Sequence, residues 1–131
     1  MTNIRMAENL LYKDLSYKLV GLAYEVFNTL GSGLKEDVYG DAFEELLKKE
    51  KLKYKRELYY PIKINNKVIS RNFFDFMIDG KIVIELKKGS QKYKEVCNQL
   101  YQYLRSADIK LGLVVRFTND GVKIKRIPNL Y

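Results

Sequence analysis

The sequence contains no histidine, and this absence excludes several kinds of active site. There can be no Ser-His-Asp triad, no Cys-His pair, no histidine general base and no histidine ligand for a metal. Cysteine is also scarce, because Cys97 is the single thiol of the chain. A zinc site built on cysteines and a disulfide framework both need more than one thiol. Any metal must therefore be held by oxygen ligands, which favours Mg²⁺ or Mn²⁺.

The chain also lacks a long apolar run. No stretch is long and apolar enough to cross a membrane, and residues 1–8 lack the apolar segment of a signal peptide. Together with the single cysteine, these features predict a protein of the reducing cytoplasm with no membrane partner. The 131 residues are 47% hydrophobic and 31% charged, an ordinary composition for one globular domain spanning 1–131.

Acidic residues are outnumbered by basic ones. The formal net charge is +8 and the isoelectric point is near 9.4. A strongly basic chain is suited to a polyanionic partner, most simply nucleic acid. Lysine-rich solvated faces are also common, so the charge alone does not identify the partner.

The spacing of apolar residues predicts three helices. Residues 8–30 carry an apolar stripe at helical spacing, and Gly31 and Gly33 end this helix. A second helix is expected over 35–50. A third is expected over 91–106, with Ser90 as its N-cap.

Elsewhere the apolar period changes to two, which predicts strands. We expect a break, bulge or edge position at Pro61 and a tight turn at Asn65-Asn66. The expected strands lie at 52–61, 62–64, from 68 onward, on both sides of a turn within 75–87, at 111–117 and at 122–127. The order is ααβ(β)ββαββ, an α/β (α+β) fold with a mixed β-sheet flanked by helices.

The hairpin over 75–87 places Asp75, Glu85 and Lys87 among apolar residues, where charges are costly unless they are paired or bind a cation. A two-residue loop at Asp79-Gly80 leaves Glu85 on the face opposite to Asp75. A three-residue loop over 79–81, with Gly80 left-handed, puts Asp75 opposite Glu85 with Cβ atoms about 5 Å apart. We expect the three-residue loop, or another of odd length, because it creates one continuous apolar face from Phe74, Phe76, Ile78, Ile82, Ile84 and Leu86.

Two carboxylates that face each other need a shared proton or a cation between them. A hard divalent ion suits this pair. Lys87 shares the face of Glu85, where it can help a metal-activated water or stabilise charge on a phosphate. The three residues are therefore a coherent site for phosphodiester hydrolysis. An ion pair of Lys87 with Glu85 or Asp75, without catalysis, accounts for the spacing equally well.

Several motifs resemble a known nuclease superfamily. Asp75, Glu85, Leu86 and Lys87 resemble the PD-(D/E)xK motif, with Asn-Phe-Phe before Asp75 in place of proline. Residues 33–39, Gly-Leu-Lys-Glu-Asp-Val-Tyr, are similar to the signature of the GxxExxY proteins, a branch of that superfamily. The similarity continues through 82–87, 98–104 and 111–114. It implies a restriction-endonuclease-like core and a Mg²⁺- or Mn²⁺-dependent nuclease that hydrolyses DNA.

The resemblance also implies roles for individual residues. The metal ligands would be Asp75, Glu85, Glu36 and the backbone carbonyl of Leu86. Lys87 would be the catalytic lysine, and Gln99 would face the site from the following helix. For Tyr39, a core or supporting role is favoured over catalysis. Family members often carry a histidine where this chain has Val96, and alanine where it has Lys88. For Glu36, a favourable position in the first turn of a helix is a sufficient structural explanation.

Two groups of lysines are expected to contact nucleic-acid phosphates: Lys88, Lys92 and Lys94, which flank the site, and Lys123 and Lys125 near the end of the chain. A solvated face explains each cluster equally well. Two other functions stay open. One is a non-catalytic nucleic-acid-binding module on a degenerate nuclease fold. The other is a protein-interaction subunit, in which the eleven tyrosines serve an interface such as that of a homodimer.

Overall fold

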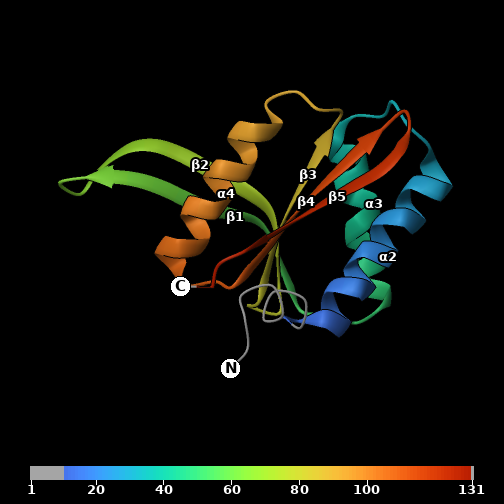
Figure 1. Cartoon of the computed structure of the whole chain (residues 1–131), viewed down its shortest axis with the longest axis horizontal. Coiled ribbons are helices and arrows are strands. Elements are labelled where there is room, and N and C mark those ends of the chain that lie inside the picture. Colours follow the sequence, from blue (N-terminus) through green and yellow to red (C-terminus); the bar gives the residue numbers. More distant parts are fainter. Residues whose placement is uncertain (1–10, 131) are drawn as a thin grey trace.

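Five strands form one mixed sheet with helices on both faces (Figure 1). The computed structural model describes residues 11–130. In chain order, the elements are α2 (Lys13–Leu30), α3 (Glu36–Lys49), β1 (Tyr54–Ile64), β2 (Lys67–Ile78), β3 (Ile82–Lys88), α4 (Tyr93–Ala107), β4 (Leu111–Thr118) and β5 (Gly121–Pro128). The sheet order is β1-β2-β3-β4-β5, and β3 and β4 are parallel while the other neighbours are antiparallel. The predicted α/β (α+β) fold of restriction-endonuclease-like type is confirmed.

Two details of the predicted elements are wrong. The separate strand at 62–64 does not exist, because β1 continues through Pro61 on the edge of the sheet, with a bulge between Ile62 and Lys63. Ser90 is not an N-cap, because α4 begins after Lys92, which has a left-handed backbone (φ 56°) and no capping side chain. Residues 8–10 of the first predicted helix, and the expected lack of a signal segment at 1–8, lie outside the described residues. Within residues 11–130, no helix has the length and apolarity needed to span a bilayer.

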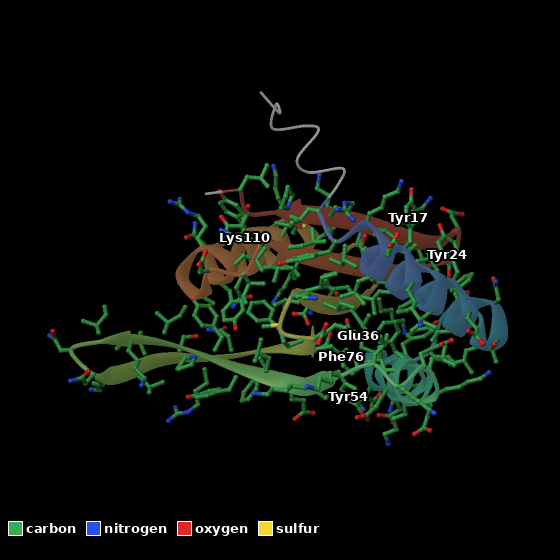
Figure 2. All side chains as sticks on the ribbon, turned by 90° about the horizontal axis from the view of Figure 1, so that it is seen from below. Tyr17, Tyr24, Glu36, Tyr54, Phe76 and Lys110 are labelled. Carbon is green, nitrogen blue, oxygen red and sulfur yellow. The ribbon has the colours of Figure 1, made fainter. Side chains whose placement is uncertain are left out.

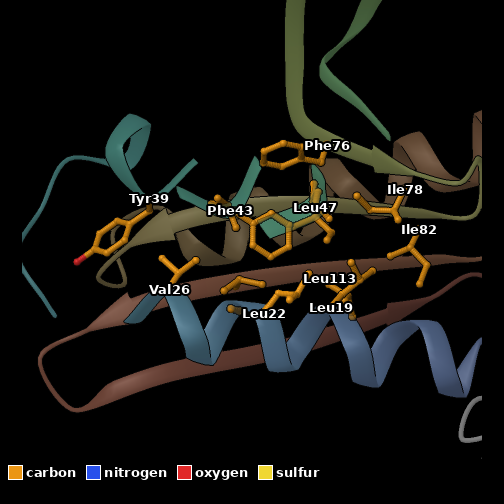
Figure 3. Packing of buried hydrophobic residues seen from close by; sticks show 14 of the residues in the cluster. Leu19, Leu22, Val26, Tyr39, Phe43, Leu47, Phe76, Ile78, Ile82 and Leu113 are labelled. Carbon is orange, nitrogen blue, oxygen red and sulfur yellow. The ribbon is translucent and has the colours of Figure 1, made fainter. Parts of the chain in front are cut away.

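Alternation along the strands divides the core into two layers. On β3, Ile82, Ile84 and Leu86 pack toward α2 and α3, whereas Val83 packs toward α4. Figure 3 shows the first layer, in which Phe43 and Leu47 of α3 meet apolar residues of α2 and the sheet. The second layer contains Val96, Leu100 and Leu104 of α4, which is the apolar side predicted for this helix. Because strand neighbours point to opposite faces, one sheet supports both layers.

The close fit of α4 on the sheet depends on Gly112 of β4. A Cβ atom built there lies 2.9 Å from Leu100 Cδ2 and 3.2 Å from Leu104 Cδ1. We expect Gly112→Ala to destabilise the protein by about 1–3 kcal/mol, because two buried leucines must shift. Gly21→Ala is the matched control, since a Cβ atom on α2 meets nothing within 4 Å. Replacing glycine inside a helix stabilises by up to about 1 kcal/mol. Urea unfolding of both variants measures the difference, and equal shifts would contradict the packing argument.

The outer parts of β1 and β2 extend from the sheet as a two-stranded arm (Figure 1). At the base of the arm, side chains two residues apart on the same strand point to opposite faces of the sheet. Arg56 and Phe76 lie together on the α3 side, whereas their neighbours two residues along, Leu58 and Phe74, pack with α4. The change occurs at Glu57, whose φ of 58° is left-handed, and regular pairing is interrupted there.

This turn of the arm corrects one part of the sequence analysis. Phe74 was expected on the same apolar face as Phe76, but it belongs to the α4 layer, where it packs against Tyr103 at 5.0 Å between ring centroids. The unpaired residue opposite Glu57 is Asp75, by continuation of the register on either side. The chain therefore leaves regular strand geometry at the position of the candidate carboxylate.

Candidate active site

The hairpin between β2 and β3 has the predicted three-residue loop. Ile78 pairs with Ile82, and the amide of Lys81 donates to the carbonyl of Ile78 at 2.9 Å. Gly80 is left-handed as expected (φ 65°), and Asp79 is left-handed too (φ 52°). Continuing this register past Phe76 and Ile84 puts Asp75 opposite Glu85.

Side chains replace the ladder hydrogen bonds at this pair of residues. The amide of Asp75 donates to Glu85 Oε1 at 3.2 Å, and the amide of Leu86 donates to Asp75 Oδ2 at 2.6 Å. Each carboxylate therefore accepts a hydrogen bond from the strand of the other. The reciprocal bonds hold both carboxyl groups at the point where regular pairing of β2 and β3 ends.

Glu85 is 8% exposed, and its environment opposes ionisation. Burial raises the pKa of Glu85 most, and a hydrogen bond to Asp75 and the charge of Asp75 raise it further, to about 10. The positive charge of Lys87 acts in the opposite direction. The carboxyl pair consequently keeps a proton at neutral pH when no cation is present.

Lys87 and Glu36 meet at the end of β3. Lys87 Nζ lies 4.0 Å from Glu36 Oε2, and the amide of Lys88 donates to Glu36 Oε1 at 3.3 Å. The structure thus brings the predicted residue of α3 to the predicted lysine of β3. Glu36, labelled in Figure 2, is an exposed residue in the first turn of α3.

Gln99 reaches the base of the arm from α4. Its Nε2 donates to Asn72 Oδ1 of β2 at 2.6 Å. Asn72 was not singled out from the sequence, although it lies three residues before Asp75 in the Asn-Phe-Phe-Asp segment that carries the motif. The catalytic role implied for Gln99 stays a prediction. Gln99 lies on the face of the sheet that α4 covers, and Val83 packs on the same face.

The 33–39 motif has a structural explanation in the loop between α2 and α3. Gly33 has a left-handed φ of 87°, which permits the turn. Tyr39 is fully buried, stacks on Phe117 with 4.2 Å between ring centroids, and donates its hydroxyl to the carbonyl of Gly31 at 2.6 Å. The same hydroxyl accepts from the amide of Leu34 at 3.3 Å. Tyr39 is therefore a core residue that fixes the loop leading to Glu36.

We expect Tyr39→Phe to destabilise the protein by about 1–2 kcal/mol, because the carbonyl of Gly31 and the amide of Leu34 lose a partner while the stacking ring remains. Chemical unfolding measures the change. Tyr24→Phe is the control, since Tyr24 is an exposed tyrosine of α2 and should leave stability within about 0.5 kcal/mol of the parent. An equally small effect at Tyr39 would show that the hydroxyl does not hold the loop.

The predicted phosphate-binding lysines are not equivalent. Lys88 Nζ donates to the carbonyl of Gly33 at 3.3 Å, and Lys92 and Lys94 are exposed at the start of α4. Lys123 and Lys125 are exposed on β5. Arg116 of β4 lies next to these groups and was not predicted. The available signal was its position as the only charged residue within the apolar strand 111–117.

Two cavities lie outside the carboxylate pair. The larger, about 800 Å³, is at the loop end of β2, where Met77, Asp79 and Gly80 contribute to its wall. The smaller, about 450 Å³, is at the opposite end, beside Lys88, Arg116 and Lys123. The larger cavity has none of the candidate catalytic side chains in its wall, so the candidate active site does not coincide with it.

The oxygen atoms of the two carboxylates are the kind of ligand that a hard divalent cation prefers. Asp75 and Glu85 already face each other, and a cation between them would relieve their repulsion. Among residues 11–130, no three histidine, cysteine, aspartate or glutamate side chains gather closely enough to hold a metal. Glu36 contacts Lys87 and Lys88 instead of the carboxylate pair. A role for Glu36 as a ligand therefore requires that its side chain turn away from the lysines.

Comparison with known proteins identifies the family. A family model described as the PD-(D/E)XK nuclease superfamily matches residues 13–127. No curated protein matches the sequence. Among solved structures, "Crystal structure of SSO0001" matches with a TM-score of 0.54 at 22% identity, over 95% of this chain and 61% of that chain. At this identity the likeness concerns the fold, and the chain spans less than two thirds of that protein. The family match over residues 13–127, together with the fold, establishes that the chain belongs to the PD-(D/E)XK nuclease superfamily.

Proposed function

We propose that this protein is a Mg²⁺- or Mn²⁺-dependent deoxyribonuclease of the GxxExxY branch, which hydrolyses phosphodiester bonds of DNA. The observation that supports it most is the paired carboxyls of Asp75 and Glu85, each bonded to the strand of the other, with Lys87 on the same face of β3. A structural ion pair does not need two facing carboxyl groups, one of them buried with its pKa raised to about 10. A cation site does.

Asp75, Glu85 and the carbonyl of Leu86 are the groups that we assign to the cation, with Glu36 as a further ligand. When bound, a divalent ion supplies positive charge to the phosphate and lowers the pKa of a bound water. Charge repulsion between the two carboxylates then no longer requires a shared proton.

The remaining residues act on the substrate and on the site itself. Lys87 Nζ donates to the phosphate that is cut and stabilises the negative charge that develops on it. Before a cation binds, Glu36 orients Lys87 from α3, since the two side chains approach to 4.0 Å. When Glu36 serves as a ligand, its side chain turns from Lys87 to the cation. Gln99 orients Asn72 at the base of the arm through their hydrogen bond of 2.6 Å. Lys88, Lys92, Lys94, Lys123 and Lys125 bind phosphates that are not cut.

Cleavage of plasmid, single-stranded, forked and junction DNA with Mg²⁺ or Mn²⁺ tests the proposal. We expect cutting by the parent protein and loss of cutting on chelation of the metal. Asp75→Ala, Glu85→Ala and Lys87→Ala should each lose activity. If these variants cut as fast as the parent, the assignment of the site is wrong. Binding of DNA without cleavage, and without metal binding by calorimetry, would favour the non-catalytic binding module instead.

A homodimer and a cytoplasmic location stay predictions of the same proposal. Exposed apolar side chains that favour self-association gather on the arm, at Tyr59, Ile62, Ile64, Ile69 and Phe73, and α2 and α3 also expose Tyr17, Tyr24 and Val38. Light scattering after size-exclusion chromatography measures the oligomeric state. A monomer at all concentrations would remove the homodimer and leave the hydrolytic site unaffected.

A further inference from the structure

We propose that a second phosphate of the DNA backbone, adjacent to the one that is cut, binds between Arg116 and Lys123 at the ends of β4 and β5. The inference rests on the proposed function, because it assumes that the backbone reaches Lys87. It adds a binding residue, Arg116, and a direction in which the substrate crosses the sheet.

Three cations stand in one row across three neighbouring strands. Lys87 of β3 is the direct partner of Arg116 of β4, and Arg116 is the direct partner of Lys123 of β5. Direct partners share a face of the sheet, and like charges directly opposite each other are destabilising. Strands lie about 4.8 Å apart, so the row extends roughly 10 Å from Lys87. An anion beside the row relieves the repulsion.

Within residues 11–130, no carboxylate neutralises the outer two cations. The ion pairs in this part of the chain include Lys87 with Glu36 but involve neither Arg116 nor Lys123. Asp120 lies near them in the turn between β4 and β5 and is exposed, without an ion pair to either. A half-buried arginine without a carboxylate partner is suited to an external anion.

Tyr93 of α4 holds the guanidinium in place. The Arg116 Cζ atom lies over the Tyr93 ring, 4.2 Å from its centroid. A stacked guanidinium keeps its N–H donors in the plane of the group, directed away from the ring. The stacking fixes one rotamer of a long side chain and so lowers the entropic cost of binding a phosphate.

The row borders the cavity of about 450 Å³. Polar side chains line its wall, three of them cationic and one acidic: Lys88, Ser90, Arg116, Thr118, Asn119, Asp120 and Lys123. Lys88 directly follows Lys87, and Gly33 of the wall belongs to the loop that leads to Glu36. The cavity therefore adjoins the candidate site on the side away from the arm. The DNA strand, as we infer it, runs from the base of the arm across Lys87 toward β5.

Binding experiments with Ca²⁺ in place of Mg²⁺ test this subsite without cleavage. The probes are a fluorescein-labelled single-stranded DNA, its matched duplex, and a series in which one phosphate at a time is a neutral methylphosphonate. For Arg116→Gln we expect roughly 3- to 10-fold weaker binding of unmodified DNA and a salt slope lower by about 1. The variant should also lose its sensitivity to methylphosphonate at one position beside the cut phosphate and keep it elsewhere.

Lys49→Gln is the charge-matched control, because Lys49 is an exposed lysine at the end of α3. Tyr93→Leu should weaken binding less than Arg116→Gln, and Tyr93→Phe should restore it, since phenylalanine retains the stacking ring. Thermal melts by circular dichroism verify that each variant is folded. If Arg116→Gln and Lys49→Gln weaken binding equally, or if every methylphosphonate position keeps its effect, the subsite is overturned.

The outcomes separate this inference from the proposed function. A parent that cuts DNA, combined with an Arg116→Gln variant that behaves as the control, overturns the subsite and supports the hydrolysis. A parent that binds without cutting, with an Arg116→Gln variant that loses sensitivity at one methylphosphonate position only, overturns the hydrolysis and supports a phosphate subsite at Arg116. A parent protein that binds neither the single-stranded nor the duplex DNA overturns both the proposed hydrolysis and the subsite.

Discussion

Glu85→Gln is expected to lower the rate of DNA cleavage by on the order of 10³-fold or more. Glutamine has nearly the same shape and keeps an oxygen that accepts from the amide of Asp75, so the geometry of the hairpin is preserved. It removes the negative charge with which Glu85 would hold a cation. Initial rates of plasmid cleavage in Mg²⁺ measure the effect.

The control for this variant is Glu45→Gln on α3. Glu45 is exposed and its side chain forms an ion pair of 3.6 Å with Lys48 on the same helix. Exposed pairs of this kind contribute less than about 1 kcal/mol to stability, and we expect the parental rate of cleavage. A Glu85→Gln protein that is folded and also cuts at the parental rate would remove Glu85 from the catalytic site.

The second large effect is a loss of stability of the metal-free protein as the pH rises, caused by the ionisation of Glu85. The folded-state pKa of Glu85 is raised to about 10 from 4.5, so the folded protein binds a proton more tightly than the unfolded chain. The stabilising contribution of that proton is complete below pH 4.5 and is lost as the pH rises toward 10. Within this window the metal-free protein should lose on the order of 1 kcal/mol per pH unit. Unfolding by urea in chelator, between mildly acidic and mildly alkaline pH, measures the slope.

Glu85→Gln should flatten this slope, because glutamine does not titrate. At neutral pH the variant should be more stable than the metal-free parent by about 1–3 kcal/mol. Mg²⁺ should stabilise the parent increasingly as the pH rises, and calorimetry in buffers of different ionisation enthalpy should detect protons released on binding. Identical slopes for the parent and the variant would show that Glu85 is already ionised in the folded protein.

These two expectations have a common cause. The site brings together two carboxyl groups whose mutual repulsion destabilises the fold when no cation is bound. The same arrangement is what makes a cation bind. Activity and metal-free stability should therefore change in opposite directions at Glu85, which a residue with a purely structural role would not do.

Much of the fold could be predicted because local patterns agree with it. The apolar alternation of Ile82 and Ile84 favoured a loop of odd length, with three residues expected, and the structure has the three-residue loop. A break, bulge or edge position was predicted at Pro61, and the edge is the outcome, since an edge strand tolerates a residue without an amide donor.

The errors arise where long-range packing overrides local pattern. Phe74 lies on the unexpected face because β1 and β2 turn over at Glu57, and nothing near Phe74 in the sequence reveals a left-handed residue on the neighbouring strand. Ser90 has the chemistry of an N-cap, but α4 begins two residues later than expected, and Lys92 with a left-handed backbone (φ 56°) occupies the N-cap position.

The candidate site was only partly visible in the sequence for the same reason. Asp75 and Glu85 lie within one hairpin, so their meeting could be derived from the length of one loop. Glu36 was found through the family motif, since the contact between α3 and the end of β3 joins residues far apart in the chain. Arg116 and Lys123 face each other only after β4 and β5 have paired in register, and a charge count along the sequence does not reveal that row.

The loop over 79–81 also limits how relatives of this chain can change in length during evolution. Extra residues at Asn65-Asn66 lengthen the arm and leave Asp75 and Glu85 in place, because that turn lies beyond both carboxylates. One residue inserted between Ile78 and Ile82 turns Glu85 to the other face of the sheet and separates it from Asp75. Selection for the chemistry of this pair would therefore tolerate insertions and deletions at the tip of the arm, and would remove them from the loop at the other end of β2.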